Sequence, residues 1–372
     1  MIKDLKICVL SEYAYSLLSG ITNEIGGAEL QMTMLAKALV KKSYDVSFVS
    51  FGNSPYFTQI NGLNVYNPFD IQNNGYNYLK PTNMVSLFKT LRKIDADIYI
   101  QRGVTPLTGL VAFFCKLNKK KFIYSVASDA AVSSYLNIET IQDIEKIVYK
   151  TGVRLSNEIV CQSNVQRDLL NKRGKKSVLI KNAYIPPSLS HGNEDEVRSI
   201  WVGRTVKEKR PDLYLRLAEK IPEYKFLMVG APSTKDCEYY KFIKKEAEKI
   251  NNLQFLGFVP HNKINEYYSK SAVLINTSPG EGFPNTFLEA WGNSIPVVSF
   301  VNPDNIISNN KLGICVNNFD EMVENTIKLL ENKDLRIEMG SNGRNYVLNE
   351  HSFDNVLDSY ERLFEKLVLT PI

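Results

Sequence analysis

Two glutamates, Glu281 and Glu289, are separated by seven residues in a stretch whose composition suits an oxygen-rich ligand. Carboxylates accept hydrogen bonds from paired hydroxyl groups, such as those of a ribose or a hexose. Pro284 fits the first position of a helix and Gly292 its end. Backbone amides from Phe283 to Thr286 would then be donors at the helix start. A surface helix with two solvated glutamates is the alternative, but it leaves the Gly- and Pro-rich loop before the helix unexplained.

Short apolar runs on both sides of this stretch, residues 271–275 and 295–300, predict two buried strands. A third strand, residues 197–202, precedes a loop that contains Arg204 and Lys209. Arginine offers a planar fork for phosphate and lysine a point charge, so this loop could hold a diphosphate. An ordinary solvated basic loop is the alternative.

The stretch from Asn276 to Gly292 resembles the signature of glycosyltransferase family 4, in which two such glutamates bind a nucleotide-sugar. Gly282-Phe283-Pro284-Asn285 and Leu288-Glu289-Ala290 match that signature between and after the glutamates. Arg204 and Lys209 resemble the diphosphate clamp of the family. Gly26-Gly27-Ala28-Glu29 resembles the turn that opens its first long helix.

The resemblance implies a role for each matched position. Glu289 would bind the ribose, while Glu281 and the amides near Phe283 to Asn285 would orient the sugar, with Gly282 and Pro284 also part of the donor site. Arg204 and Lys209 would stabilise charge on the leaving diphosphate, with help from the amides near Gly27. Backbone near Phe258 and Val259 would receive the base.

Asp129 is assigned a catalytic position because the segment Ser125–Asp129 follows a predicted strand, where ligands bind in such folds. Many members of the family place a histidine near this point, but this chain has no histidine before His191. Ser128 or Asp129 would substitute for it. The alternative for Asp129 is a helix cap or a turn.

The chain of 372 residues suits two domains. Alternating strands and helices predict parallel sheets covered on both faces, and residues 182–195 read as a linker. The expected fold is α/β: two Rossmann-like domains facing across a cleft (GT-B), with a C-terminal helix crossing back. The expected boundaries are 1–190 for the acceptor domain, 191–352 for the nucleotide-sugar domain and 353–372 for the returning helix.

Element patterns place strands and helices along both domains. Strands are expected at 5–10, 44–50, 64–66, 97–101, 121–126, 158–161, 177–181, 224–230, 253–260 and 312–316. Helices are expected at 28–40, 83–94, 106–117, 138–155, 164–172, 211–221, 236–250, 319–330, 334–348 and 353–367. Ser163 and Gln166 predict a capping box, and residues 11–27 a polar loop.

Composition limits the chemistry further. Five scattered cysteines and three distant histidines argue against a disulfide framework and a metal site, and for a reducing cytoplasm. No signal peptide or membrane span is visible. Lysine and arginine outnumber acids up to residue 190, and this suggests an anionic partner such as a membrane surface, with an ordinary solvated surface as the alternative. Nucleic acid is not expected, because no reading helix or interleaved aromatic residues stand out.

The resulting prediction is a retaining, metal-independent transfer of a hexose from a nucleoside-diphosphate sugar to an acceptor hydroxyl. No cofactor is expected, and a UDP-sugar is favoured over a GDP-sugar. The acceptor would be a lipid-linked or cell-surface glycan precursor at the inner membrane face. The alternatives are a non-catalytic nucleotide-sugar sensor and a nucleotide-sugar epimerase or glycan phosphorylase on the same scaffold; a phosphorylase of the known kind would be longer.

Overall fold

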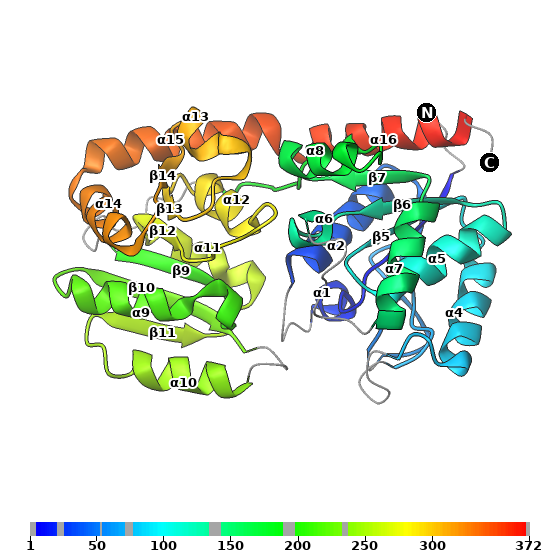
Figure 1. Cartoon of the computed structure of the whole chain (residues 1–372), viewed down its shortest axis with the longest axis horizontal. Helices are drawn as coiled ribbons and strands as arrows, with labels where there is room; N and C mark the ends of the chain where they lie inside the picture. The colour runs from blue at the N-terminus through cyan, green and yellow to red at the C-terminus, as the bar shows by residue number, and fades with distance from the viewer. Residues whose placement is uncertain are drawn as a thin grey trace. The chain divides into compact units, whose positions relative to one another are not determined.

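The computed structural model describes residues 5–20, 26–52, 54–70, 77–133, 143–188, 198–232 and 237–369. The chain divides into two compact α/β units, Met1–Ala183 with Asp354–Ile372 (unit 1) and Tyr184–Phe353 (unit 2) (Figure 1). The predicted border between residues 190 and 191 lies outside the described residues, and the units divide between Ala183 and Tyr184.

Unit 1 is built on an eight-stranded sheet of order β3-β4-β2-β1-β5-β6-β7-β8. All neighbouring strands are parallel except β3 and β4. The buried strands are runs of apolar residues, as expected where helices cover both faces. The strands are β1 (Lys6–Leu10), β2 (Asp45–Val49), β3 (Phe57–Ile60), β4 (Leu63–Tyr66), β5 (Ile98–Arg102), β6 (Lys121–Ser125), β7 (Glu158–Cys161) and β8 (Val178–Leu179).

The antiparallel edge strand β3 is absent from the sequence prediction. It forms a hairpin with β4 through Asn61 and Gly62, whose φ angles are 50° and 83°. An Asn-Gly pair between two short strands is a strong hairpin signal, because both residues accept the left-handed conformation that such a turn needs. The hairpin could therefore have been predicted from this Asn-Gly pair, and the prediction of a parallel sheet was wrong at this edge.

The helices of unit 1 match most of the predicted ranges. A short helix, α1 (Tyr15–Ser19), replaces part of the predicted polar loop, and the first five residues of the helix predicted at 138–155 lie outside the described residues. The others are α2 (Gly27–Lys41), α4 (Pro81–Ile94), α5 (Pro106–Leu117), α6 (Ala130–Ser133), α7 (Asp143–Leu155) and α8 (Asn164–Lys172).

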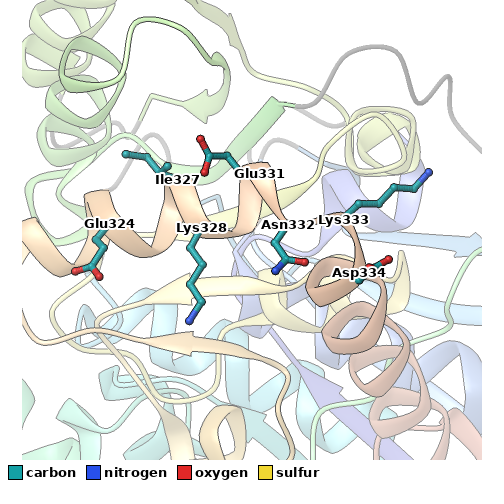
Figure 2. A pocket seen from close by; sticks show the side chains of 7 residues that line it. All are labelled: Glu324, Ile327, Lys328, Glu331, Asn332, Lys333 and Asp334. Carbon is teal, nitrogen blue, oxygen red and sulfur yellow. The ribbon is translucent and has the colours of Figure 1, made fainter.

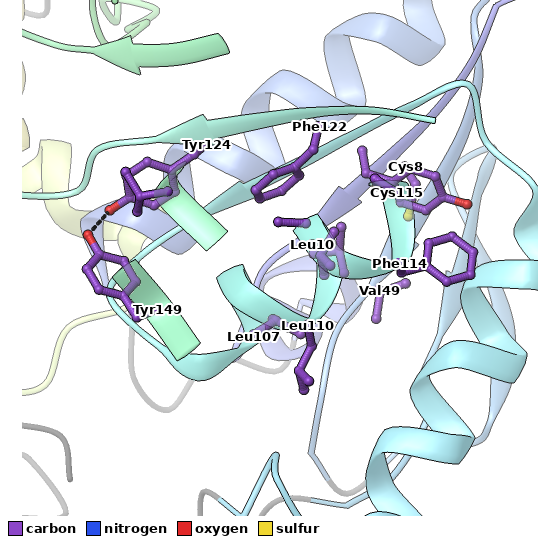
Figure 3. Packing of buried hydrophobic residues seen from close by; sticks show 14 of the residues in the cluster. Cys8, Leu10, Val49, Leu107, Leu110, Phe114, Cys115, Phe122, Tyr124 and Tyr149 are labelled. Carbon is purple, nitrogen blue, oxygen red and sulfur yellow. Dashed lines mark hydrogen bonds between the residues drawn. The ribbon is translucent and has the colours of Figure 1, made fainter. Parts of the chain in front are cut away.

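One apolar cluster of unit 1 lies between the sheet and helices α4, α5 and α7. Figure 3 shows part of it, including Tyr124 and Tyr149, whose buried hydroxyl groups lie 2.7 Å apart. Helices α5 and α7 approach closely at Gly109 and Gly152, where a Cβ on Gly152 would lie 2.6 Å from the Gly109 backbone. The capping box at α8 is partly confirmed: Ser163 accepts from the Gln166 amide, but Gln166 Oε1 accepts from the Gln162 amide instead of that of Ser163.

Helix α16 (Phe353–Leu369), at the end of the chain, belongs to unit 1. Its apolar face, spaced as the sequence predicts, is buried. The Tyr44 hydroxyl donates to Glu361 Oε1 at 3.0 Å, and Lys366 forms an ion pair with Glu158. These contacts fasten the last helix to the beginnings of β2 and β7.

Unit 2 has a six-stranded parallel sheet of order β11-β10-β9-β12-β13-β14. Numbered within the unit, this is 3-2-1-4-5-6, the strand order of dinucleotide-binding Rossmann folds. The strands before β12 are added on one side of β9 and those from β12 onward on the other, so the strand order reverses between β9 and β12. The strands are β9 (Arg198–Arg204), β10 (Lys225–Ala231), β11 (Leu253–Gly257), β12 (Val273–Asn276), β13 (Val297–Ser299) and β14 (Gly313–Cys315).

Two apolar clusters, one on each face of the sheet, form the core of unit 2. Two short helices that were not predicted from the sequence, at Ile264–Tyr268 and Ile306–Asn309, follow strands β11 and β13. The helices are α9 (Pro211–Lys220), α10 (Cys237–Ala247), α11 (Ile264–Tyr268), α12 (Asn285–Gly292), α13 (Ile306–Asn309), α14 (Phe319–Glu331) and α15 (Lys333–Glu350), with single turns η1 (Lys207–Lys209), η2 (His261–Lys263) and η3 (Pro303–Asn305).

Over the described residues, no helix combines the length and the apolar composition needed to cross a membrane.

Candidate functional site

Most of the predicted site residues lie at one edge of the unit 2 sheet. Arg204 is the last residue of β9, and Asn276 is the last residue of its neighbour β12. Ligands of open α/β sheets bind outside the carboxyl ends of the strands, where the strand order reverses. The loops after β9 and β12 therefore lie at the expected binding position of this unit.

A buried hydrogen-bond chain joins these two loops. The Trp201 indole Nε1 donates to Thr277 Oγ1 at 2.9 Å, and the Thr277 hydroxyl donates to the Lys209 carbonyl at 2.7 Å. Trp201 and Thr277 are almost completely buried. These two hydrogen bonds fix the backbone of Lys209 relative to the segment that leads to Glu281.

The side chains of Lys209 and Glu281 form an ion pair within unit 2. Both are partly buried, with 26% and 15% of their side chains exposed. Arg204 is exposed and makes no ion pair with any described residue, whereas the nearby Arg210 pairs with Asp212 at 3.0 Å. The basic loop thus holds one neutralised lysine and one arginine whose charge is not balanced.

Helix α12 starts one residue later than predicted. Pro284 is the N-cap, with extended angles of φ −66° and ψ 123°, and Asn285 is the first helical residue. No side chain caps this helix and its first turn contains no acidic residue. Such a start favours an anion or a hydroxyl oxygen from outside the helix.

Gly292 ends helix α12, as the sequence predicts. Gly292 is the last helical residue, and the C-cap is Asn293. A Cβ at Gly292 would lie 2.4 Å from Cε1 of Tyr184, so the glycine is required by close packing of that ring. The packing holds the C-terminal end of α12 against the segment that begins unit 2.

Glu289 projects from α12 into a buried environment, with only 6% of its surface exposed. The Tyr268 hydroxyl, on α11, donates to Glu289 Oε2 at 2.9 Å. His261 Nε2 lies 3.3 Å from the other oxygen, Oε1, but is not aligned for a good hydrogen bond. Interaction with the Glu289 carboxylate raises the pKa of His261, although burial opposes it. Burial, followed by the charge of Glu289, raises the pKa of the Tyr268 hydroxyl.

The remaining predicted residues of unit 2 surround these groups less directly. Gly282 is buried, and Phe283 and Asn285 are half-buried in the loop and at the start of α12. Phe258 and Val259 follow β11, and the same turn continues into His261. Val259 and Phe283 both pack against the apolar cluster that contains Tyr268 and Leu288. No described contact joins Phe258 or Arg204 to either glutamate.

Gly27 and Asp129 lie in unit 1. Gly27 is exposed and is the first residue of α2, with Gly26 as an extended N-cap. Asp129 directly precedes α6, and its Oδ1 accepts a hydrogen bond from Gln166 Nε2 at 2.8 Å. This bond and its place before a helix are consistent with the structural alternative for Asp129.

Three polar residues with notable surroundings, Tyr268, His261 and Arg102, were not predicted as site residues. Tyr268 and His261 contact Glu289, and His261 also begins η2. In unit 1, Arg102 ends β5, is 8% exposed and forms no ion pair with a described residue. Its Nη2 donates to Asn182 Oδ1 at 3.1 Å. The sequence signal for this last residue was an arginine at the end of a strand, with one residue between it and the apolar run 98–100.

The described residues contain no group of three or more His, Cys, Asp or Glu side chains placed to hold a metal ion. A surface hollow of about 660 Å³ lies along α14 and the start of α15 (Figure 2). Its lining contains none of the predicted site residues; it consists of Glu324, Ile327, Lys328, Glu331, Asn332, Lys333 and Asp334.

Comparison with known proteins agrees with this geometry. Residues 190–346 match the family described as glycosyl transferases group 1, and this segment contains every predicted site residue of unit 2. Over 356 residues the chain is 23% identical to an uncharacterized glycosyltransferase of Haemophilus influenzae, covering 90% of this chain and 95% of the relative.

Solved structures show the same fold over nearly the whole chain. Sucrose-phosphate synthase from Thermosynechococcus elongatus superposes with a TM-score of 0.81 at 15% identity, covering 98% and 99% of the two chains. HepE from Anabaena, solved in complex with UDP and glucose, gives a TM-score of 0.73 at 15% identity, covering 98% and 100%. The fold is therefore GT-B, and unit 2 contains the segment that matches the group 1 glycosyltransferase family.

Proposed function

We propose that this protein transfers a hexose from a nucleoside-diphosphate sugar to an acceptor hydroxyl, with retention of anomeric configuration and without a metal. The observation that carries the proposal is the arrangement in unit 2: two glutamates, a lysine and an unbalanced arginine lie on loops and a helix at the reversal of strand order. The group 1 domain and the relatives' names support a transferase.

The residue roles follow from chemistry. Breaking the bond to the sugar places negative charge on the leaving diphosphate, and Arg204 and Lys209 would stabilise that charge in place of a metal. Glu289 would accept from ribose hydroxyls. Glu281 and the start of α12 would orient the sugar. On unit 1, the amides near Gly27 and the side chain of Asp129 remain predictions for the phosphate and the sugar.

A UDP-sugar is the donor that we favour. HepE, which shares the fold, was solved with UDP and glucose, and this supports the choice without fixing it. The alternatives are a protein that binds the donor without turnover and an epimerase. They differ from a transferase in a direct assay, because only a transferase releases nucleoside diphosphate in proportion to a glycosylated acceptor.

Thermal unfolding with UDP, GDP and ADP tests the donor site. A nucleotide at a hundred times its dissociation constant should stabilise the native chain by about 2.7 kcal/mol. We expect one nucleotide to raise the Tm, and Glu289→Ala and Arg204→Ala to respond weakly. Glu266→Ala and Lys220→Ala, at exposed positions of unit 2, are matched controls. A folded native chain that responds to none of the three would refute the donor-site assignment.

We also propose that unit 1 contacts an anionic membrane surface through the outer faces of α4 and α5. These helices contain no acidic residue and expose Val85, Phe113 and Leu117 beside Lys89, Arg92 and Lys116. The Phe88 and Phe113 rings stack with centroids 6.4 Å apart, which joins the two helices. Apolar side chains among cations suit insertion between anionic lipid headgroups.

Co-sedimentation with vesicles tests this surface. We expect binding to phosphatidylglycerol vesicles, weaker binding to phosphatidylcholine vesicles, and loss of binding in the double variant Lys89→Glu, Lys116→Glu. The variant Lys220→Glu, on unit 2, should bind as the native chain does. Equal binding by all the variants would remove α4 and α5 from the proposal. Such a surface would place a cytoplasmic enzyme beside lipid-linked acceptors.

A further inference from the structure

The two oxygens of Glu289 have different neighbours. Oε2 accepts from the Tyr268 hydroxyl at 2.9 Å, and both side chains are buried. Oε1 lies 3.3 Å from His261 Nε2, in a contact that lacks hydrogen-bond alignment. A carboxylate oxygen has two acceptor sites, so Oε1 keeps capacity for a further donor.

We infer that Tyr268 and His261 are positioning residues for Glu289: Tyr268 fixes the carboxylate through Oε2, and the ionisation state of His261 decides how open Oε1 is to a nucleotide hydroxyl. This inference rests on the proposed function, in which Glu289 binds the ribose. Tyr268 and His261 act through Glu289 and are not assigned to the reacting atoms.

The supporting elements explain why the position of Glu289 is well defined. Tyr268 ends α11, His261 starts the turn that precedes it, and Glu289 lies on α12. Asn293 Nδ2 donates both to Asn265 Oδ1 at 3.1 Å and to the Glu289 carbonyl at 2.8 Å. These bonds tie α11, which carries Tyr268, to the end of α12, which carries Glu289.

Few ionisable groups of the described residues lie near the Glu289 carboxylate. The ionisable groups near Glu289 are Tyr268 on α11, His261 on η2 and Tyr184 from the first segment of unit 2. Arg344, on α15, uses its guanidinium on the Gly292 and Pro187 carbonyls. His261 is the one of these four groups whose ordinary pKa lies near neutrality.

Protonation of His261 should weaken nucleotide binding. An imidazolium beside Oε1 would partly neutralise that oxygen and, once aligned, would occupy one of its two acceptor sites, which weakens the bond that Oε1 can form with a ribose hydroxyl. Because Glu289 raises the pKa of His261 above 6.5, the competition begins above pH 6.5 as the pH is lowered. About one third of the His261 side chain is exposed, so solvent can supply the proton.

The first experiment measures discrimination between ribose and deoxyribose. Dissociation constants are measured for UDP, GDP and ADP and for their 2′-deoxy and 3′-deoxy counterparts. We expect the native chain to prefer the ribonucleotide over at least one deoxy analogue. Tyr268→Phe should reduce that preference about three- to tenfold, the effect of one lost hydrogen bond.

Tyr267→Phe is the matched control, because Tyr267 is adjacent in sequence and its hydroxyl makes no hydrogen bond to a described residue. The preference should be unchanged in this variant. A general loss of stability would weaken all nucleotides equally and leave the preference intact. The ratio therefore separates positioning from a purely structural role.

The second experiment follows the dissociation constant of the best nucleotide from pH 5.5 to 8.5. We expect affinity to fall as the pH is lowered in the native chain, and a flatter profile in His261→Asn, whose side chain does not ionise. His261 is partly exposed, so this variant should fold even if Tyr268→Phe does not.

The outcomes distinguish the inference from the function on which it rests. If no nucleotide binds the native chain, the proposed function and this inference both fail. If a nucleotide binds and Tyr268→Phe keeps the full ribose preference, or His261→Asn keeps the native pH profile, the inference fails and the function stands.

Discussion

The surroundings of Glu281 and Glu289 differ although the same motif supplies both residues. Glu281 lies in a half-buried loop and is neutralised by Lys209. Glu289 lies on a helix, is buried, and has a tyrosine hydroxyl and a histidine as its neighbours. Burying a carboxylate without a full cationic partner costs free energy. The difference indicates that the charge of Glu281 is balanced by an ion pair, whereas the charge of Glu289 is held by a tyrosine hydroxyl and depends on the ionisation of His261.

The strongest test of the loop is Lys209→Met. If Lys209 binds the diphosphate, the native chain should prefer UDP, GDP or ADP over the monophosphate of the same base. Loss of one charge-assisted hydrogen bond costs about 1.5–3 kcal/mol, so that preference should fall about 10- to 150-fold. Calorimetry with both nucleotides measures it. Lys207→Met, on the same turn, is the control, and an undiminished preference would remove Lys209 from the clamp.

The next test compares how tightly the chain is packed near Glu281 and at the end of α12. Gly292→Ala should lower the free energy of unfolding by about 1–3 kcal/mol, because the new methyl group would overlap the Tyr184 ring. Gly280→Ala should change it by less than about 0.5 kcal/mol, because a Cβ at Gly280 meets no atom within 4 Å. Urea unfolding of both variants gives the comparison. Equal effects would mean that the loop near Glu281 is as tightly packed as the end of α12.

Replacing each glutamate by glutamine should have a smaller effect on the free energy of unfolding, and the effect should differ between the two positions. Glu281→Gln removes a partly exposed ion pair and should lower the free energy of unfolding by at most about 1 kcal/mol. Glu289→Gln keeps an acceptor for Tyr268 but removes a buried charge, so stability should be unchanged or higher while nucleotide binding is lost. Urea unfolding and calorimetry on the same samples check both statements. A marked loss of stability in Glu289→Gln would contradict this account of Glu289.

The smallest expected effect is the pH dependence of stability. The folded-state pKa of His261 is raised above 6.5, so its contribution is fully present below pH 6.5 and is lost as the pH rises through the folded pKa. The native chain should therefore lose stability relative to His261→Asn on going from pH 6 upward. Parallel curves for the two proteins would show that His261 and Glu289 do not interact.

Much of the scaffold could be predicted because its signals are local. Helices α5 and α8 begin and end where the sequence predicts, since a proline or a capping serine marks each start. The match of residues 190–346 to the group 1 family likewise follows from motifs that are continuous in sequence. The hairpin at Asn61 and Gly62 was missed although its signal was also local.

The contacts of Glu289 could not be predicted in the same way. Tyr268 and His261 precede it by 21 and 28 residues, and no spacing rule identifies which of the neighbouring tyrosines points inward. The packing of α11 on α12 decides that. Gly292 was correctly assigned to a helix end, but its packing against Tyr184 could not be predicted, because Tyr184 lies more than a hundred residues earlier.

The return of α16 to unit 1 has a consequence for protein synthesis. Unit 2 is a continuous segment, Tyr184–Phe353, inserted between two parts of unit 1. A ribosome that has released residue 353 has provided all of unit 2, whereas Tyr44 and Glu158 still lack their α16 partners. Because domains fold as units during synthesis, unit 2 can be complete first, and unit 1, whose synthesis begins earlier, is completed last.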